Sequence, residues 1–316
     1  MPQRLGRCWK GCSRMAKRKS EFRRALRFIR YPLEAVAAVI IFSLFAALPV
    51  ERASGLGGWI GRKIGPKLGV SKRSERNMRR ALPDLDDAEI ATAMREMWDN
   101  LGRVAGEMPH IRRIARWART GDIEVVNRGY LEQYSEDGKT VIFFSGHFAN
   151  WELFALISRE LGVPYAQVYR AANNPLVDRL LRRFRRLDEA DIIPKGPAGA
   201  KKLIGLMREG RRLGMLVDQK MNDGIPVPFF GREAMTAPAL AQLALRNGCP
   251  AIPVRLERLS GCSFRATILP PLEPPETGDR HQDIALMMIE VNRLFEDWIV
   301  ERPGQWLWLH RRWPDT

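Results

Sequence analysis

The stretch TVIFFSGHFANWELFALISREL, residues 140–161, passes from an apolar run through a glycine to an amphipathic segment. The run TVIFFS is short and continuously apolar, which is typical of a strand buried inside a parallel sheet. Gly146 lets the backbone turn closely, and Asn150 is placed to cap a helix that begins at Trp151. The stretch therefore predicts a strand-to-helix connection at the carboxyl edge of an α/β sheet, where such folds bind their ligands.

The same alternation continues along the chain. The β-rich runs PYAQVYR (164–170), ADIIP (190–194) and LGMLVDQ (213–219) alternate with amphipathic stretches such as NPLVDRLLRRFR and GAKKLIGLMREG. Two later runs, split by Ser260 and Gly261, predict an antiparallel hairpin. We therefore expect one α/β domain with a mostly parallel mixed sheet flanked by helices.

Composition indicates a folded chain with an anionic partner. The 316 residues are 45% hydrophobic and carry a formal charge of +16, from 52 Lys and Arg against 36 Asp and Glu. The apolar residues are numerous enough to form a hydrophobic core. The excess of positive charge favours binding to an anionic partner. The four cysteines, at positions 8, 12, 249 and 262, fit no zinc-binding spacing. We expect reduced thiols in a domain that faces the cytosol, and no bound metal.

The N-terminal part of the chain predicts a membrane anchor. Residues 1–32 are dense in Lys and Arg, and residues 33–50 are apolar over a length close to that of a bilayer-spanning helix. A buried core helix and a cleaved signal peptide are the alternatives, and translation from Met15 would shorten the basic lead. Cations on both sides of the helix leave open whether it spans the membrane or lies on one face. The main domain is then residues 51–316.

Two further segments combine cations with glycine or tryptophan. GLGGWIGRKIGPKLGVSKR (55–73) suits contact with lipid headgroups, with a solvated linker as the alternative. RPGQWLWLHRRW (302–313) favours tryptophans at a bilayer interface and arginines on phosphates. Stacking on nucleic-acid bases is the rival interpretation, but no nucleic-acid-binding motif is present and we expect no such partner. His310 is interpreted as structural.

The spacing of His147 and Glu152 suggests general-base catalysis. His147 lies on the predicted loop and Glu152 in the first helical turn, from which its carboxylate can reach back to an imidazole nitrogen. A carboxylate on one nitrogen fixes the tautomer, and the other nitrogen can then take a proton from a hydroxyl. The alternative is that Glu152 only favours the helix N-terminus and His147 is an ordinary loop residue.

The chain resembles a known family in several sequence blocks. SGHFANWELF (145–154) resembles the H-x4-D/E motif of the lysophospholipid acyltransferase superfamily. Four further blocks are similar to the lipid A biosynthesis acyltransferases in particular, and in the same order: QVYRAANNP (167–175), GMLVDQ (214–219), VPFFGREAMTAPALAQLA (227–244) and WLWLHRRW (306–313). The resemblance covers essentially the whole chain, including the N-terminal membrane helix.

The resemblance implies transfer of a fatty acyl chain from acyl carrier protein to a hydroxyl of a phosphorylated glycolipid, a lipid A precursor of the Kdo-lipid IVA type. The reaction would take place at the cytoplasmic face of the inner membrane, next to anionic lipids and without a cofactor. His147 would be the base and Glu152 its partner. Because no G-x-S-x-G motif is present, direct attack by the acceptor is the simpler mechanism, and Ser145 is a strand residue.

Other residues on the same sheet edge are candidates for substrate binding. Arg170 ends a strand and suits a lipid phosphate or the oxyanion, with a surface arginine as the alternative. Asp218 ends another strand and suits a role in holding Arg170 or the acceptor sugar, or in capping a turn. Asn150 and Asn174 are assigned to the substrate, although a helix N-cap also explains Asn174.

The PFFG block, residues 228–231, is a candidate for binding the acyl chain. Phe229 and Phe230 are predicted to line an apolar slot for the acyl chain, unless they are simply core. Basic runs such as RLLRRFRR (179–186) suit attraction of an acidic carrier protein or a phosphorylated lipid. Two other functions stay open. One is acyl transfer to a phosphatidylinositol mannoside, an aminolipid or a lysophospholipid, and the other is a non-catalytic, membrane-anchored basic binding protein.

Overall fold

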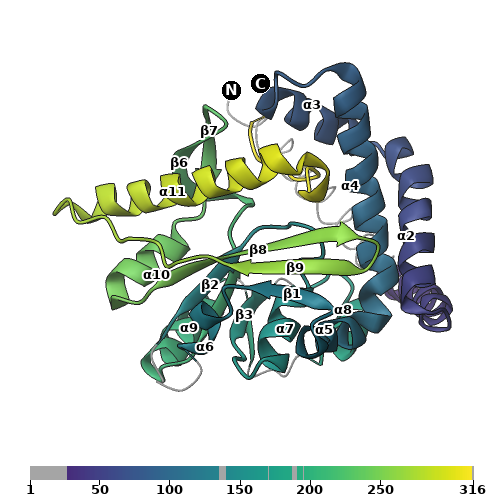
Figure 1. The fold of residues 1–316 in the computed structure, drawn as a ribbon, viewed down its shortest axis with the longest axis horizontal. Coiled ribbons are helices and arrows are strands. Elements are labelled where there is room, and N and C mark those ends of the chain that lie inside the picture. The colour runs from purple at the N-terminus through teal and green to yellow at the C-terminus, as the bar shows by residue number, and fades with distance from the viewer. Residues whose placement is uncertain (1–26, 135–139, 170, 187–190, 195, 315–316) are drawn as a thin grey trace, which may run out of the picture.

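The computed structural model describes residues 27–134, 140–169, 171–186, 191–194 and 196–314. Its centre is a seven-stranded sheet with the order β1-β9-β8-β2-β5-β3-β4, and β6 and β7 form a separate pair (Figure 1). The strands are β1 (Ile123–Val126), β2 (Ile142–Ser145), β3 (Ala166–Tyr169), β4 (Ile192–Pro194), β5 (Leu213–Leu216), β6 (Lys220–Phe229), β7 (Arg232–Thr236), β8 (Ala251–Ser260) and β9 (Ser263–Ile268).

The sheet confirms the predicted class. All neighbouring strands in it run parallel except β8 and β9, which form the expected antiparallel hairpin around Gly261. The central strand β2 is continuously apolar because both of its faces are covered. Ile142 and Phe144 pack with α10 (Ala239–Asn247) and α11 (Arg280–Glu301), whereas Phe143 packs against Phe154 on the opposite side.

Helices cover both faces of the sheet. In Figure 1, α11 crosses one face, while α5 and α7 lie beneath the other. The remaining elements are α2 (Val50–Ile64), α3 (Ser71–Ala81), α4 (Asp87–Glu107), α5 (Ile111–Thr120), α6 (Gly129–Glu132), α7 (Leu153–Glu160), α8 (Pro175–Arg185), α9 (Pro197–Arg208) and the 3-10 turns η1 (Gly65–Lys67), η2 (Met108–His110) and η4 (Pro303–Gln305).

The glycine-rich segment after residue 54 is a packed helix in its first part, so the interpretation of this segment as a solvated linker is wrong, while the predicted contact with lipid headgroups stays a prediction. Gly57 and Gly61 of α2 lie directly against Gly102 and Gly106 of α4, along the length of the two helices (Figure 1). A Cβ atom on Gly102 would come within 2.1 Å of the carbonyl oxygen of Gly57. These glycines allow two backbones to approach more closely than any larger residue permits.

The N-terminal helix spans Arg27–Ala46 and is long and apolar enough to cross a membrane, with a mean hydropathy of 1.8 and few buried side chains. It starts earlier and ends earlier than the predicted 33–50. It packs lengthwise on α8, since Asn174 at the start of α8 donates to the carbonyl of Tyr31 and Phe184 near its end contacts Phe42. The basic residues 1–26 lie outside the described residues.

The C-terminal tryptophans belong to the core rather than to a membrane surface. Trp306, Trp308 and Trp313 are buried, and Arg312 is completely buried among them over the face of Phe229. The predicted contact of these residues with lipid is therefore wrong. Aromatic residues and arginine are common at membrane interfaces, but an aromatic cluster around one buried arginine whose terminal nitrogens are hydrogen-bonded is equally compatible with a core.

Candidate active site

Strand register brings His147 and Asp218 together. Strands β2 and β5 are parallel neighbours, and Ser145 pairs with Leu216 at their carboxyl ends. His147 and Asp218 each lie two residues beyond this pair, and Val217 N–H still donates to the carbonyl of Ser145. The two side chains therefore leave the same edge of the sheet at the same level, where α/β folds place their ligand sites.

His147 and Asp218 make two hydrogen bonds. The backbone N–H of His147 donates to Oδ2 of Asp218 at 2.8 Å, and Nδ1 of the ring lies 2.7 Å from Oδ1. Trp306 Nε1–H also donates to Oδ2, at 2.9 Å. An ionised carboxylate only accepts hydrogen bonds, so Nδ1 must carry the proton and Nε2 is left with its lone pair.

Asp218 is held ionised despite its burial. Its burial alone would raise its pKa, but the positive charge of His147 in its protonated form and the hydrogen bonds from His147 and Trp306 outweigh this effect. The net result is a pKa of Asp218 below its usual value. The predicted role of Asp218 in holding Arg170 or the acceptor sugar is therefore corrected: its carboxylate holds His147. Arg170 itself lies outside the described residues.

Glu152 does not occupy the position predicted for it. Its Oε1 lies 2.5 Å from Nη2 of Arg185, a buried arginine of α8, and forms an ion pair there. The predicted contact between Glu152 and His147 is therefore wrong, because the carboxylate of Asp218 already occupies Nδ1. The sequence did not reveal Asp218 as the partner of His147, because the two residues are 71 positions apart in the chain. The only feature of the sequence that indicated this pairing is that His147 and Asp218 each follow an apolar strand.

The loop that carries His147 is fixed along its backbone. Leu307 N–H donates to the carbonyl of His147, and Ala149 N–H donates to the carbonyl of Gln305. Ala149 has a φ of +47°, a left-handed conformation that is costly for a residue with a Cβ atom. The C-terminal segment therefore holds the loop in a strained shape that aims the imidazole.

A buried ionic network also contacts the loop that carries His147. Glu107 at the end of α4 is completely buried and pairs with Arg258 of β8 at 2.5 Å. Asn150 donates to the other carboxylate oxygen at 2.8 Å, and Asn100 donates to the carbonyl of Ala149. Removing one member would leave a buried charge without its partner, which is strongly destabilising.

Both asparagines that were predicted to bind substrate, Asn150 and Asn174, have structural roles. Asn150 is completely buried and bonded to Glu107, and α7 has Glu152 rather than Asn150 at its N-cap position. The predictions that Asn150 caps this helix and binds substrate are both wrong. Asn174 is also buried, and its Oδ1 accepts from the backbone N–H groups of Leu176 and Val177. The alternative interpretation of Asn174 as a helix N-cap is confirmed.

His147, Gln219 and His310 line a cavity of about 300 Å³. Gln219 Nε2 lies 3.0 Å from Nε2 of His147 and 2.8 Å from Nε2 of His310. His310, interpreted from the sequence as structural, therefore lines the same cavity as His147. The signal for it was weak, because it lies 163 residues from His147 in the chain and shares no motif with it.

The cavity extends from these polar groups into an apolar interior. Its lining includes Phe143 of β2, Met215 of β5, Phe154 of α7, Leu181 of α8 and Tyr165. The predicted slot residues lie elsewhere, because Phe229 is completely buried between Trp306 and Trp313 and Phe230 packs beside it. The prediction for Phe229 and Phe230 is therefore corrected to a core role.

Comparisons with known proteins show the family of the chain. The model of the family described as bacterial lipid A biosynthesis acyltransferase matches residues 19–315. The chain belongs to this family. It is 26% identical over 260 residues to the lipid A biosynthesis lauroyltransferase of Escherichia coli K12, covering 77% of this chain and 78% of that protein. It is 25% identical over 284 residues to the palmitoleoyltransferase of the same strain, covering 85% and 87%.

One solved structure is also similar. The crystal structure of the 1-acyl-sn-glycerophosphate acyltransferase from Thermotoga maritima aligns with 86% of this chain and 98% of its own, with 12% identity and a TM-score of 0.38. The acyltransferase is thus an enzyme of lipid A biosynthesis by its family, and its fold class follows from its own sheet. Among the described residues, no group of His, Cys, Asp and Glu side chains could hold a metal ion.

The arrangement suits acyl transfer without a covalent intermediate. A neutral imidazole with its proton fixed on Nδ1 can take a proton at Nε2 from a hydroxyl. Ser145 is not placed as a nucleophile, because its hydroxyl donates to the carbonyl of Val254 at 2.7 Å. What the acyltransferase can do at this edge is therefore to activate a hydroxyl group brought to His147.

Proposed function

We propose that the acyltransferase transfers a fatty acyl chain from acyl carrier protein to a hydroxyl of a lipid A precursor of the Kdo-lipid IVA type. The observation that supports this most directly is the pair of His147 and Asp218, which leaves a basic nitrogen facing an apolar cavity. The family and the names of its relatives favour the acceptor class. The donor follows from the resemblance of the sequence blocks to this family.

In the proposed mechanism, His147 removes the proton of the acceptor hydroxyl as the oxygen attacks the thioester carbon. Asp218 stabilises the imidazolium that forms, as a buried carboxylate does in other histidine-based sites. Gln219 is the nearest amide donor to Nε2 and would donate to the oxyanion of the tetrahedral intermediate. The proton on Nε2 then passes to the thiolate that leaves.

The apolar interior of the cavity would hold the acyl chain. Phe143, Phe154 and Tyr165 form its aromatic wall, with ring centroids 5.7 to 6.0 Å apart. Glu152 and Arg185 form a charged pair at the polar end, where the family motif places its acid. In this proposal Glu152 acts through Arg185, by holding its guanidinium at the entrance.

The proposed location is the cytoplasmic face of the inner membrane. The N-terminal helix exposes Phe28, Ile29, Leu33, Leu44 and other large apolar side chains. Such a surface is stable only against lipid or another apolar partner. The domain organisation we propose is a basic N-terminal segment, the anchor helix Arg27–Ala46 and a catalytic domain 51–316.

A mass-spectrometric assay tests the proposed function. Detergent-solubilised enzyme would be mixed with acyl carrier protein thioesters and a tetraacylated lipid A precursor. We expect a mass gain of one acyl chain with the wild type and a loss of about 100-fold or more in rate with His147→Ala. His281→Ala is the matched control, because His281 is an exposed histidine of α11. A gain that persists in His147→Ala would overturn the mechanism, and no gain with folded wild type would remove this acceptor or donor.

A further inference from the structure

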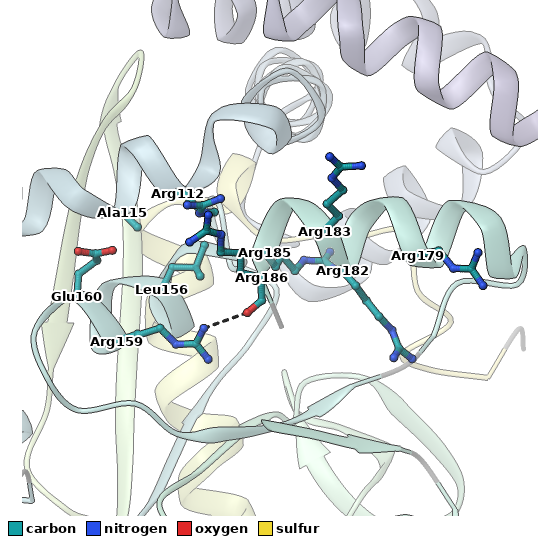
Figure 2. Close-up of a pocket in the computed structure, with 10 residues that line it drawn as sticks. All are labelled: Arg112, Ala115, Leu156, Arg159, Glu160, Arg179, Arg182, Arg183, Arg185 and Arg186. Carbon is teal, nitrogen blue, oxygen red and sulfur yellow. Dashed lines mark hydrogen bonds between the residues drawn. The ribbon is translucent and has the colours of Figure 1, made fainter. Parts of the chain in front are cut away.

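A second cavity, about 880 Å³ in volume, lies between α5, α7 and α8 (Figure 2). Its lining comprises seven arginines, one glutamate and two apolar residues: Arg112, Ala115, Leu156, Arg159, Glu160, Arg179, Arg182, Arg183, Arg185 and Arg186. We call it the arginine cleft. Figure 2 shows the side chains of Arg112, Arg185 and Arg186 gathered between the helices, while Arg179 and Arg183 point outward.

The positive charge of the arginine cleft is only partly balanced. Arg159, Arg182 and Arg185 form ion pairs with Asp191, Asp178 and Glu152. Glu160 pairs with Arg119, outside the cleft. The other four cleft arginines, at positions 112, 179, 183 and 186, form no ion pair with any residue in the ranges that the structure describes.

Arg112 illustrates the cost of this arrangement. Its pKa is lowered by burial first and then by the charges of Arg186 and Arg116, and the charge of Glu160 offsets only part of this lowering. Holding like charges together in a concave, partly buried site costs free energy that an anion would offset. Guanidinium groups that converge from several directions match a phosphate group, which accepts several charge-assisted hydrogen bonds.

The arginine cleft borders the N-terminal apolar helix. An adjoining hollow is lined by His110, Arg112, Arg183 and Phe184 among others. Phe184 packs edge-on against Phe42 of that helix, with ring centroids 5.3 Å apart, and His110 Nε2 lies 3.0 Å from the carbonyl oxygen of Phe45. The cations therefore lie beside the helix that we propose to anchor the protein, and cations next to such an anchor suit the phosphates of lipid headgroups.

The arginine cleft also adjoins the catalytic cavity. Arg185 lines both of them and pairs with Glu152 at the polar end of the catalytic cavity. Its Nε has no hydrogen-bond partner among the described residues. A headgroup with its phosphate in the cleft would thus have its other groups beside the catalytic cavity. This geometry favours a phosphorylated lipid over an acidic protein.

We propose that the arginine cleft binds a phosphate group of the glycolipid acceptor. The identity of the lipid as the acceptor rests on the proposed function, whereas the phosphate site rests on the residues of the cleft. The cleft would fix the headgroup at the membrane surface and so determine which hydroxyl meets His147. Arg112 and Arg186 are the central ligands, because neither is committed to a carboxylate among the described residues.

Binding tests the site without any turnover. The double variant Arg112→Gln/Arg186→Gln would be compared with Arg208→Gln/Arg246→Gln, which removes two exposed arginines from α9 and α10. The dissociation constant for a bis-phosphorylated, tetraacylated lipid A precursor in detergent would be measured by thermophoresis. We expect binding to weaken about tenfold or more in the cleft variant only, and this difference to disappear with phosphatase-treated lipid. Equal affinity of both variants would overturn the proposal.

Kinetics and vesicle flotation separate the remaining outcomes. In the cleft variant we expect the KM for the precursor to rise about tenfold, with the KM for acyl carrier protein thioester unchanged. A rise in the donor KM alone would assign the cleft to the acidic carrier protein and overturn the proposal. Loss of binding only to phosphatidylglycerol vesicles would assign it to bulk lipid, with the same consequence. Cleft-dependent precursor binding without acyl transfer would leave the phosphate site standing and reject the proposed function.

The cleft variant also has a folding control. Because Arg112 is destabilised by burial and by neighbouring cations, its replacement by Gln should not lower the Tm in phosphate-free buffer. Inorganic phosphate alone should raise the Tm of the wild type more than that of the cleft variant. An equal rise in both would count against the cleft as a phosphate site.

Discussion

Nδ1 of His147 lies 2.7 Å from Oδ1 of Asp218 because Ser145 and Leu216, two residues before each, pair in adjacent parallel strands. The catalytic pair that we propose is therefore a product of strand register. The acid of the local motif, Glu152, instead pairs with Arg185. Asp218 and Glu152 should therefore differ in their importance for activity.

Replacing Asp218 should impair activity more than replacing Glu152. An Asn at position 218 can donate to Nδ1 and so favour the tautomer with its proton on Nε2, which cannot act as a base. We expect Asp218→Asn to lower kcat about 10,000-fold, on the scale of the analogous change in serine proteases. Glu152→Gln keeps the side chain's shape and should cost less than about tenfold. Steady-state kinetics of the two variants decides, and a larger loss in Glu152→Gln would restore the pairing predicted from the motif.

The stability contributed by Asp218 should be lost in acid. Its pKa is lower in the folded protein than in the unfolded chain, so its carboxylate stabilises the fold above the unfolded value of about 3.9. As the pH falls below that value toward the folded pKa, the unfolded chain takes up the proton first and the stabilisation disappears. The Tm difference between wild type and Asp218→Asn should therefore shrink between pH 5 and pH 3. A constant difference over this range would contradict the assignment.

The contact between α2 and α4 should not tolerate a methyl group. In Gly102→Ala the new Cβ atom would lie 2.1 Å from the backbone oxygen of Gly57, so the helices must separate. Overpacking costs about 1–3 kcal/mol, which exceeds the gain of about 0.5–1 kcal/mol that Ala brings to a helix. We expect the Tm to fall. Gly55→Ala, in α2 with no atom within 4 Å of its Cβ position, should raise it. Equal effects of the two changes would argue against the close packing.

Cys262 should resist alkylation in the folded protein. Burial, followed by the nearby charge of Glu107, raises its pKa to about 11. At pH 8 only about one thiol in a thousand is then ionised, compared with roughly a quarter at an ordinary pKa of about 8.5. Peptide mass spectrometry after iodoacetamide treatment should find Cys262 modified only in denaturant. Rapid labelling of the native protein would show that the site beside Glu107 is open.

The sequence by itself determined the fold class, the family and the position of the histidine. Local patterns carry these features: TVIFFS is apolar throughout because β2 is covered on both faces, and Gly146 ends it where the ligand edge begins. The ordered blocks identified the family, which the comparison over residues 19–315 confirms. The hairpin of β8 and β9 was also readable, since its turn residues are adjacent.

Only the tertiary structure decided the partners. Strand order placed β5 beside β2 and thereby gave His147 its carboxylate from Asp218, which no local spacing encodes. Burial decided that Trp306 donates to Asp218 from the core instead of facing lipid, because composition alone does not distinguish a core from a membrane interface. Close packing of α2 against α4 gave the glycine-rich segment its role, because its glycines lie against Gly102. In each case the deciding interaction joins residues that are far apart in the chain.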